Sequence, residues 1–233
     1  MTAPLPARDV RLLWPTALLQ RELPDHGAVN AGLLEVFAAH RAAFPGPDPA
    51  AANYSSGDDL LARYTDPHLQ ALFAFVSQAV FDVASSVNAS AWASMPQARL
   101  SMEVVGAWFQ VQNRYGFHDI HTHGNCSWSG VYYVQIDDEA KRVRHANLGP
   151  RNGVTRFYGP SLHLLGGAYQ DLGNAYMQQG TFDVQPQAGT LIVFPSWLNH
   201  KAMPYDGDQD RVIVSFNAQV HGAGGNQTAG YGF

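Results

Sequence analysis

The pattern of hydrophobic and polar positions divides the chain into a helical first part and a strand-rich second part. The clearest periodicity starts at Asp66, after which apolar side chains recur every three or four residues to about Ser86. This is the spacing of one buried helix face, with Asp66 suited to the N-cap and Pro67 to the first turn. An apolar cluster that follows Gly32 predicts a second helix, which ends near Ala43.

From about Leu100 onward, apolar and aromatic runs of strand length alternate with clusters of Gly, Pro, Asn and Asp. This pattern predicts strands at Met102–Gln112, Ser129–Ile136, Val154–Phe157, Thr181–Val184, Leu191–Phe194 and Arg211–Gln219. Repeated short strands indicate an antiparallel sandwich or barrel, of which the jelly roll is one form. We therefore expect a mainly β single domain, with a helical part (1–99) packed on a jelly-roll core (100–220).

Three further segments carry weaker signals. Val10–Leu19 is apolar but interrupted by Pro15, which suits an edge strand. Gly159–Gly180 has no clear period and is interpreted as an active-site loop or lid. Gly222–Phe233 holds five glycines in twelve residues, so we predict a flexible tail over residues 221–233.

Composition limits the classes of protein to which the chain can belong. Its 233 residues are 46% hydrophobic and 14% charged, with a net charge of −5 and no basic run longer than Lys141–Arg144. This argues against binding to nucleic acid or to an anionic membrane surface. The single cysteine, Cys126, fits a reducing compartment, and no stretch was expected to span a membrane. We expect a cytoplasmic protein whose oligomeric state stays open, with a homodimer among the alternatives.

Three histidines form the strongest chemical signal. His121 and His123 are two residues apart on a predicted strand, which places their side chains on the same face, and His200 follows the apolar strand Leu191–Phe194. A lone histidine is usually structural, but a close pair with a distant third beside a barrel strand favours a metal site for Fe, Zn, Cu or Ni. Asp119 would share the face of His121 and is an alternative ligand.

Arg211 is the candidate for binding an anion. It follows His200 by eleven residues, and the turn signal Asp206–Asp208 lies between them. A hairpin there would place the Arg211 strand beside His200, with Arg211 and Ser215 on one face. A guanidinium grips a carboxylate through two hydrogen bonds, and Ser215 can add a third. The alternative is a surface arginine paired with an acidic residue of the turn.

Aromatic and amide side chains give further candidates for the cavity wall. Tyr132 and Tyr133 point to opposite faces, and we place Tyr133 inside the barrel, among the residues that bind the anion. Trp108, Gln110 and Gln112 alternate along the preceding strand, so one of its faces lines the cavity.

The motifs resemble those of a known family. Gly116–His123 followed by Ser129–Val134 resembles the motif of a group of uncharacterised 2-oxoglutarate/Fe(II) oxygenases. Phe194–Trp197, with His200 and then Arg211–Asn217, is similar to its second block, and Leu13–Thr16 to its N-terminal block. The resemblance covers most of the chain and implies a double-stranded β-helix, a jelly-roll relative of the cupins.

The resemblance also implies a ligand set. In that superfamily a His-x-Asp/Glu pair and a distal histidine hold iron, so His121 and His200 are implied as ligands, and Arg211 as the residue that binds the distal carboxylate of 2-oxoglutarate. His123 stands at the carboxylate position. The implied set is three histidines, with two histidines plus water, or recruitment of Asp119, as alternatives. Three neutral imidazoles favour an anionic co-substrate.

The implied activity is that of an Fe(II), 2-oxoglutarate-dependent dioxygenase, an oxidoreductase that uses O2 to hydroxylate or otherwise oxidise a small polar metabolite. One alternative is a three-histidine, cupin-type oxygenase or isomerase that does not use 2-oxoglutarate. Another is a non-catalytic barrel that senses a metal or a small ligand. The sequence does not identify the substrate.

Overall fold

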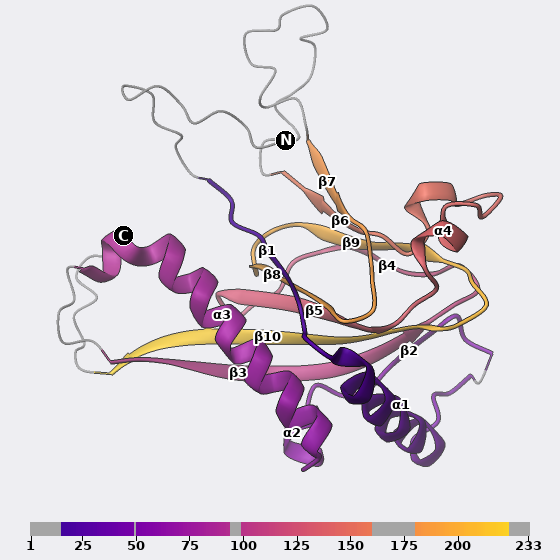
Figure 1. The fold of residues 1–233 in the computed structure, drawn as a ribbon, viewed down its shortest axis with the longest axis horizontal. Coiled ribbons are helices and arrows are strands. Elements are labelled where there is room, and N and C mark those ends of the chain that lie inside the picture. Colours follow the sequence, from indigo (N-terminus) through magenta and orange to yellow (C-terminus); the bar gives the residue numbers. More distant parts are fainter. Residues whose placement is uncertain (1–14, 49, 94–98, 160–179, 224–233) are drawn as a thin grey trace, which may run out of the picture.

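The computed structural model describes residues 15–48, 50–93, 99–159 and 180–223, which form two antiparallel β-sheets packed face to face (Figure 1). The larger sheet has six strands in the order β1-β8-β5-β10-β3-β2, and the smaller has four in the order β4-β9-β6-β7. Two long helices cover the outer face of the larger sheet. The predicted mainly β jelly roll with N-terminal helices is confirmed.

The larger sheet consists of β1 (Leu19–Glu22), β2 (Asn53–Ser55), β3 (Arg99–Gln112), β5 (Trp128–Gln135), β8 (Thr190–Pro195) and β10 (Arg211–Ala223). The smaller sheet consists of β4 (Gly116–His121), β6 (Thr155–Tyr158), β7 (Thr181–Val184) and β9 (His200–Tyr205). The helices are α1 (His26–Ala43), α2 (Leu60–Arg63), α3 (Pro67–Ala93) and α4 (Glu139–Arg142), with a short 3-10 turn at Gly149–Arg151.

All six predicted strands are present, and most of their ends lie within one residue of the prediction. The tail was predicted to begin too early, because β10 continues to Ala223 along β3. The predicted edge strand starts only at Leu19 in the described chain, where β1 pairs with β8. Residues 160–179 of the predicted lid, 224–233 of the tail and 1–14 at the start lie outside the described residues.

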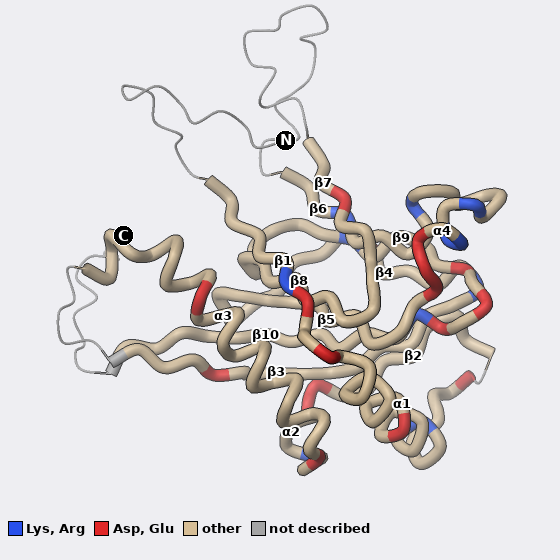
Figure 2. Tube along the Cα trace, in the orientation of Figure 1, with Lys and Arg blue, Asp and Glu red and all other residues tan. Residues whose placement is uncertain are grey.

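Strands β5 and β8 are largely apolar because both of their faces are buried. On β5, Tyr132 and Val134 pack toward the helices, whereas Val131 and Tyr133 pack toward the smaller sheet. Such two-sided burial produces continuous hydrophobic runs instead of alternation. Figure 2 places the charged residues mainly on helices, turns and sheet ends, and β5 and β8 carry none.

Helix α3 is, by length and composition alone, long and apolar enough to cross a membrane, contrary to the expectation that no stretch approaches that length. In the structure it packs along the larger sheet, with Phe73 and Phe216 of β10 in an edge-on ring contact at 6.3 Å between centroids. Its buried residues are Leu69, Leu72, Phe73, Val76, Ala79, Val80, Val83 and Ala84. Their spacing of three and four places them on one helix face, as predicted.

The turn between β9 and β10 crosses from one sheet to the other. The prediction that the Arg211 strand lies beside the His200 strand is therefore wrong: β9 pairs with β4 and β6, and β10 pairs with β3 and β5. His200 and Arg211 still meet one cavity, because each lies on the inner face of its own sheet.

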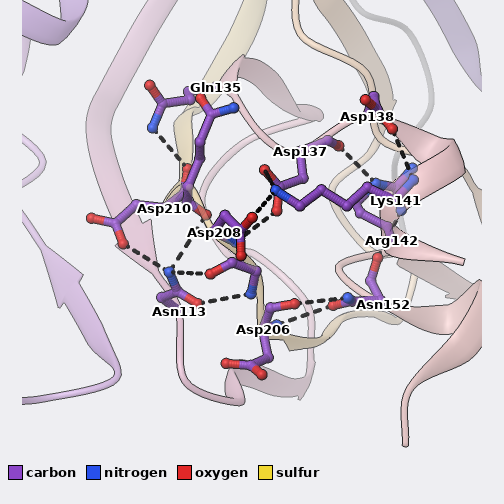
Figure 3. Close-up of polar contacts among 12 residues, drawn as sticks. Asn113, Gln135, Asp137, Asp138, Lys141, Arg142, Asn152, Asp206, Asp208 and Asp210 are labelled. Atoms are coloured by element: carbon purple, nitrogen blue, oxygen red, sulfur yellow. Dashed lines mark hydrogen bonds and ion pairs between the residues drawn. The ribbon is translucent and has the colours of Figure 1, made fainter. Parts of the chain in front are cut away.

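Side chains from outside the turn fix its course (Figure 3). The side-chain oxygens of Asn113, Asp137 and Asn152 accept hydrogen bonds from backbone N–H groups of residues 206–208, at 3.1, 2.8 and 3.0 Å respectively. Backbone N–H groups are strong hydrogen-bond donors, so these bonds favour one path for the turn. They thereby set the point at which β10 begins, and with it the position of Arg211.

Candidate metal centre

Three histidines meet at one end of a cavity between the sheets. His121 is the last residue of β4 and His200 is the first of β9, and the two residues are directly paired across these strands. One ring nitrogen from each of His121, His123 and His200 lies within 4.8 Å of the other two. The structure thus brings together all three histidines that the sequence singled out.

His123 reaches this cluster from a loop. The prediction that it shares a strand with His121 is wrong, because β4 ends at His121. The backbone N–H of His123 donates to the carbonyl of Ser196 (2.9 Å), and the N–H of Ser196 donates to the carbonyl of Ser127 (3.0 Å). The Oγ atoms of Ser196 and Ser129 are also 3.0 Å apart. These contacts tie the loop to the β8–β9 turn and hold His123 beside His200.

Backbone carbonyls set the tautomers of two of the rings. Nδ1 of His200 lies 2.9 Å from the carbonyl of Leu198, and Nδ1 of His121 lies 2.7 Å from that of Asp119. A carbonyl only accepts, so each Nδ1 carries the hydrogen and each Nε2 offers a lone pair.

The tautomer of the third ring, His123, depends on what lies between its Nε2 and Nε2 of His200. These two atoms are 3.3 Å apart. Two lone pairs at this distance repel each other, so a proton or a metal ion must lie between the two atoms. In the metal-free protein, Nε2 of His123 therefore donates to His200.

The imidazoles are held neutral by their surroundings. Burial, together with smaller contributions from His121 and His123, lowers the pKa of His200 to about 3. Burial also lowers the pKa of His123 to about 4, with a smaller contribution from His121. A metal binds only the unprotonated ring, so protons do not compete with it at neutral pH.

Asp119 does not join the cluster. Its side chain is 79% exposed and pairs with Nζ of Lys201 at 3.2 Å. The alternation that would place it with His121 is interrupted, because the pairing of β4 with β9 shifts between His118 and His121. Asp119 contributes its backbone carbonyl, not its carboxylate, to the site.

Arg211 lies in the same cavity on the opposite sheet, and only 1% of it is exposed. Its guanidinium carbon is 5.2 Å from the centre of the Tyr133 ring, and Nη1 donates to Oε1 of Gln112. In the described part of the chain no carboxylate pairs with Arg211, and its buried Nε has no partner. The surface-arginine alternative is therefore wrong, since Asp208 pairs with Lys141 and Asp210 with Arg41.

Arg142, a second buried arginine, has the hydrogen-bond partners expected of a purely structural residue. Arg142 is equally buried, but its guanidinium donates to the backbone carbonyls of Asp137, Asn152 and Pro186. Arg211 has no such set of acceptors. A buried cation that lacks acceptors is costly, so this end of the cavity is suited to an anion.

The remaining wall is mixed in polarity. It consists of Trp108, Gln110, His118, Gly130, Val131, Thr155, Phe194, Ala202, Ile213 and Ser215. Trp108 lies over His123, with ring centroids 5.9 Å apart, and Tyr133 faces the interior as predicted. Ser215 is four residues from Arg211 along β10, about 13 Å at the usual strand rise, and it is paired with Trp108, which contacts the His123 ring. Thr155 of β6 also lines the cavity, although no pattern in the sequence marks it as a site residue.

Residues 106–217 match the family described as "Putative 2OG-Fe(II) oxygenase". Comparison with curated protein sequences gives no match. The match to this family supports 2-oxoglutarate dependence over the two alternatives without it.

Two solved structures share the fold. HygX from Streptomyces hygroscopicus, with nickel and 2-oxoglutarate bound, superposes with a TM-score of 0.55 at 10% identity over 88% of this chain and 82% of HygX. The non-heme alpha-ketoglutarate-dependent epimerase SnoN from nogalamycin biosynthesis gives 0.51 at 14% identity, over 88% and 76%. The matched stretch 106–217, which carries the three histidines and Arg211, is thus similar to the 2OG-Fe(II) oxygenase family, and the chain shares its fold with solved structures that bind 2-oxoglutarate.

Proposed function

We propose that this protein is a 2-oxoglutarate/Fe(II) oxygenase that hydroxylates, or otherwise oxidises, a small polar metabolite, with His121, His123 and His200 as iron ligands and Arg211 as the residue that binds 2-oxoglutarate. The observation that carries the proposal is one cavity with two complementary ends. Three imidazole nitrogens converge at one end, and a buried guanidinium without a carboxylate partner lies at the other.

The donor set fits iron. His121 and His200 present Nε2 lone pairs, and neutral imidazoles suit late first-row metals. Because none of the three ligands is a carboxylate, an anionic co-substrate would neutralise the positive charge of the metal. When bound, iron with 2-oxoglutarate and O2 supplies the oxidation: succinate and CO2 form, and one oxygen atom becomes available to the substrate.

The side chains of the chain orient these partners. Arg211 holds the distal carboxylate, which directs the 2-oxo acid end toward the histidines. Val131, Phe194 and Ile213 give this part of the cavity an apolar wall that excludes water.

The polar side chains of the wall support a polar substrate. Nε2 of Gln110 lies 3.3 Å from Nδ1 of His118, and both residues line the cavity. Few but well-placed polar groups in a largely apolar wall are typical of sites for small molecules.

The test is turnover of 2-oxoglutarate to succinate, measured by mass spectrometry with and without a panel of small polar metabolites. We expect succinate to form only with both Fe(II) and O2. His200→Ala should lose metal binding, and Arg211→Met should raise the 2-oxoglutarate concentration that is needed, whereas the exposed Arg114→Met serves as the matched control. Unchanged turnover in His200→Ala, or metal binding without consumption of 2-oxoglutarate, would contradict the proposal.

A further inference from the structure

Gln112 is the residue directly opposite Arg211 in the pairing of β3 with β10. Directly opposed residues project from the same face of a sheet, with Cβ atoms about 4.5–5.5 Å apart. Gln112 is only 1% exposed, so its amide is enclosed with the guanidinium.

The orientation of this amide follows from the chemistry of its neighbour. A guanidinium has donors only, so Gln112 must turn its Oε1 toward Nη1 of Arg211. This leaves Nε2, a donor, directed elsewhere.

Nε2 of Gln112 is buried and has no hydrogen-bond partner. Among the described residues, the buried side-chain polar atoms without a partner are Nε2 of Gln112, Nε of Arg211 and Nδ1 of His68. Two of these three atoms are therefore donors of a single cross-strand pair. Buried polar groups in native proteins are nearly always bonded, so each exception calls for an explanation.

We infer that Gln112 is a second residue that binds 2-oxoglutarate. Its Nε2 donates to the distal carboxylate beside Arg211, while its Oε1 positions the guanidinium. A carboxylate has two oxygens that accept several hydrogen bonds, so it can satisfy donors on both side chains. This inference rests on the proposed function, because it assumes that Arg211 binds that carboxylate.

The test compares two ligands on Ni(II)-loaded protein by isothermal titration calorimetry. One ligand is 2-oxoglutarate, and the other is 2-oxopentanoate, which lacks the distal carboxylate. In Gln112→Met we expect the Kd for 2-oxoglutarate to rise about tenfold or more, as for a lost hydrogen bond to a charged group. The Kd for 2-oxopentanoate should stay within about twofold, since sites that do not interact behave additively.

Gln135→Met is the matched control, because Gln135 lies on the other neighbour of β10 and donates to the carbonyl of Asp210 instead of to Arg211. It should leave both affinities unchanged. An unchanged 2-oxoglutarate affinity in Gln112→Met, or an equal loss for the two ligands, would overturn the inference, since an equal loss marks a merely structural role.

A second variant keeps the test decisive if Gln112→Met does not fold. Gln112→Glu retains an acceptor for Arg211 but puts a negative charge where the donor is needed. We expect it to lose 2-oxoglutarate binding and keep 2-oxopentanoate binding; retained 2-oxoglutarate affinity would overturn the inference. Failure of the proposed function is distinguishable, because wild-type protein would then not bind 2-oxoglutarate, or Arg211→Met would bind it normally.

Discussion

Burial of His200 should make the metal-free protein lose stability in mild acid. The pKa of His200 is about 3 in the folded protein, against about 6.5 for histidine in an unfolded chain. Between these values the unfolded state takes up a proton that the folded state does not, so the free energy of unfolding rises with pH in this window. The loss begins near pH 6.5 and, at 1.4 kcal/mol per pH unit, reaches about 2 kcal/mol at about pH 5. His123, with a pKa of about 4 but a half-buried ring, should add a smaller loss.

The assay is urea denaturation of EDTA-treated protein at about pH 7.5 and about pH 5. His200→Gln cannot titrate, so the wild-type protein should lose about 2 kcal/mol more than this variant between the two conditions. Carboxylates and the histidines outside the three-histidine cluster act equally in both proteins and cancel in the difference. The exposed His221→Gln is the control and should behave like the wild type. An equal loss of stability in wild type and His200→Gln would refute the reasoning.

Two further predictions concern residues near the metal centre. Asp119→Asn should leave the Ni(II) affinity within about twofold of wild type, because the carboxylate faces Lys201 and not the histidines; a tenfold weakening in calorimetry would show instead that it is a ligand. Gly130→Ala should lower the free energy of unfolding by about 1–3 kcal/mol through overpacking. The added Cβ would lie 2.3 Å from Cζ of Phe216 and 2.6 Å from the carbonyl oxygen of Ile192, and wild-type stability in urea would contradict this.

The parts of the fold that sequence could predict are those with a simple burial pattern. Strands β5 and β8 are buried on both faces and α3 on one, so their apolar residues form runs or helical stripes. Strand β9 escaped prediction because four of its six residues are only half-buried and it includes Lys201 and Pro204. Strand β2 has three residues, too few for any periodicity to register.

The candidate site also has a part that the sequence predicts and a part that it does not. The spacing of His121, His123 and His200 was sufficient to predict a cluster of histidines that could hold a metal ion, because residue type and proximity to a strand carry that signal. Asp119 could not be excluded from the sequence, since only the irregular pairing of β4 turns its side chain away from the histidines. Gln112 pairs with a residue 99 positions away, and nothing short of the strand register brings the two together.

The charge balance of the cavity links the ligand set to Gln112. None of the residues found to line the cavity is acidic, while Arg211 contributes a buried positive charge. On the proposed ligand set, with His123 in place of a carboxylate, a divalent metal would add two further positive charges that none of the described lining residues neutralises. The dianion 2-oxoglutarate would fit this imbalance if, as proposed, one carboxylate faces the metal and the other lies between Arg211 and Gln112. Each partner then reduces the electrostatic cost of binding the other, so metal and 2-oxoglutarate affinities should strengthen each other by the same factor.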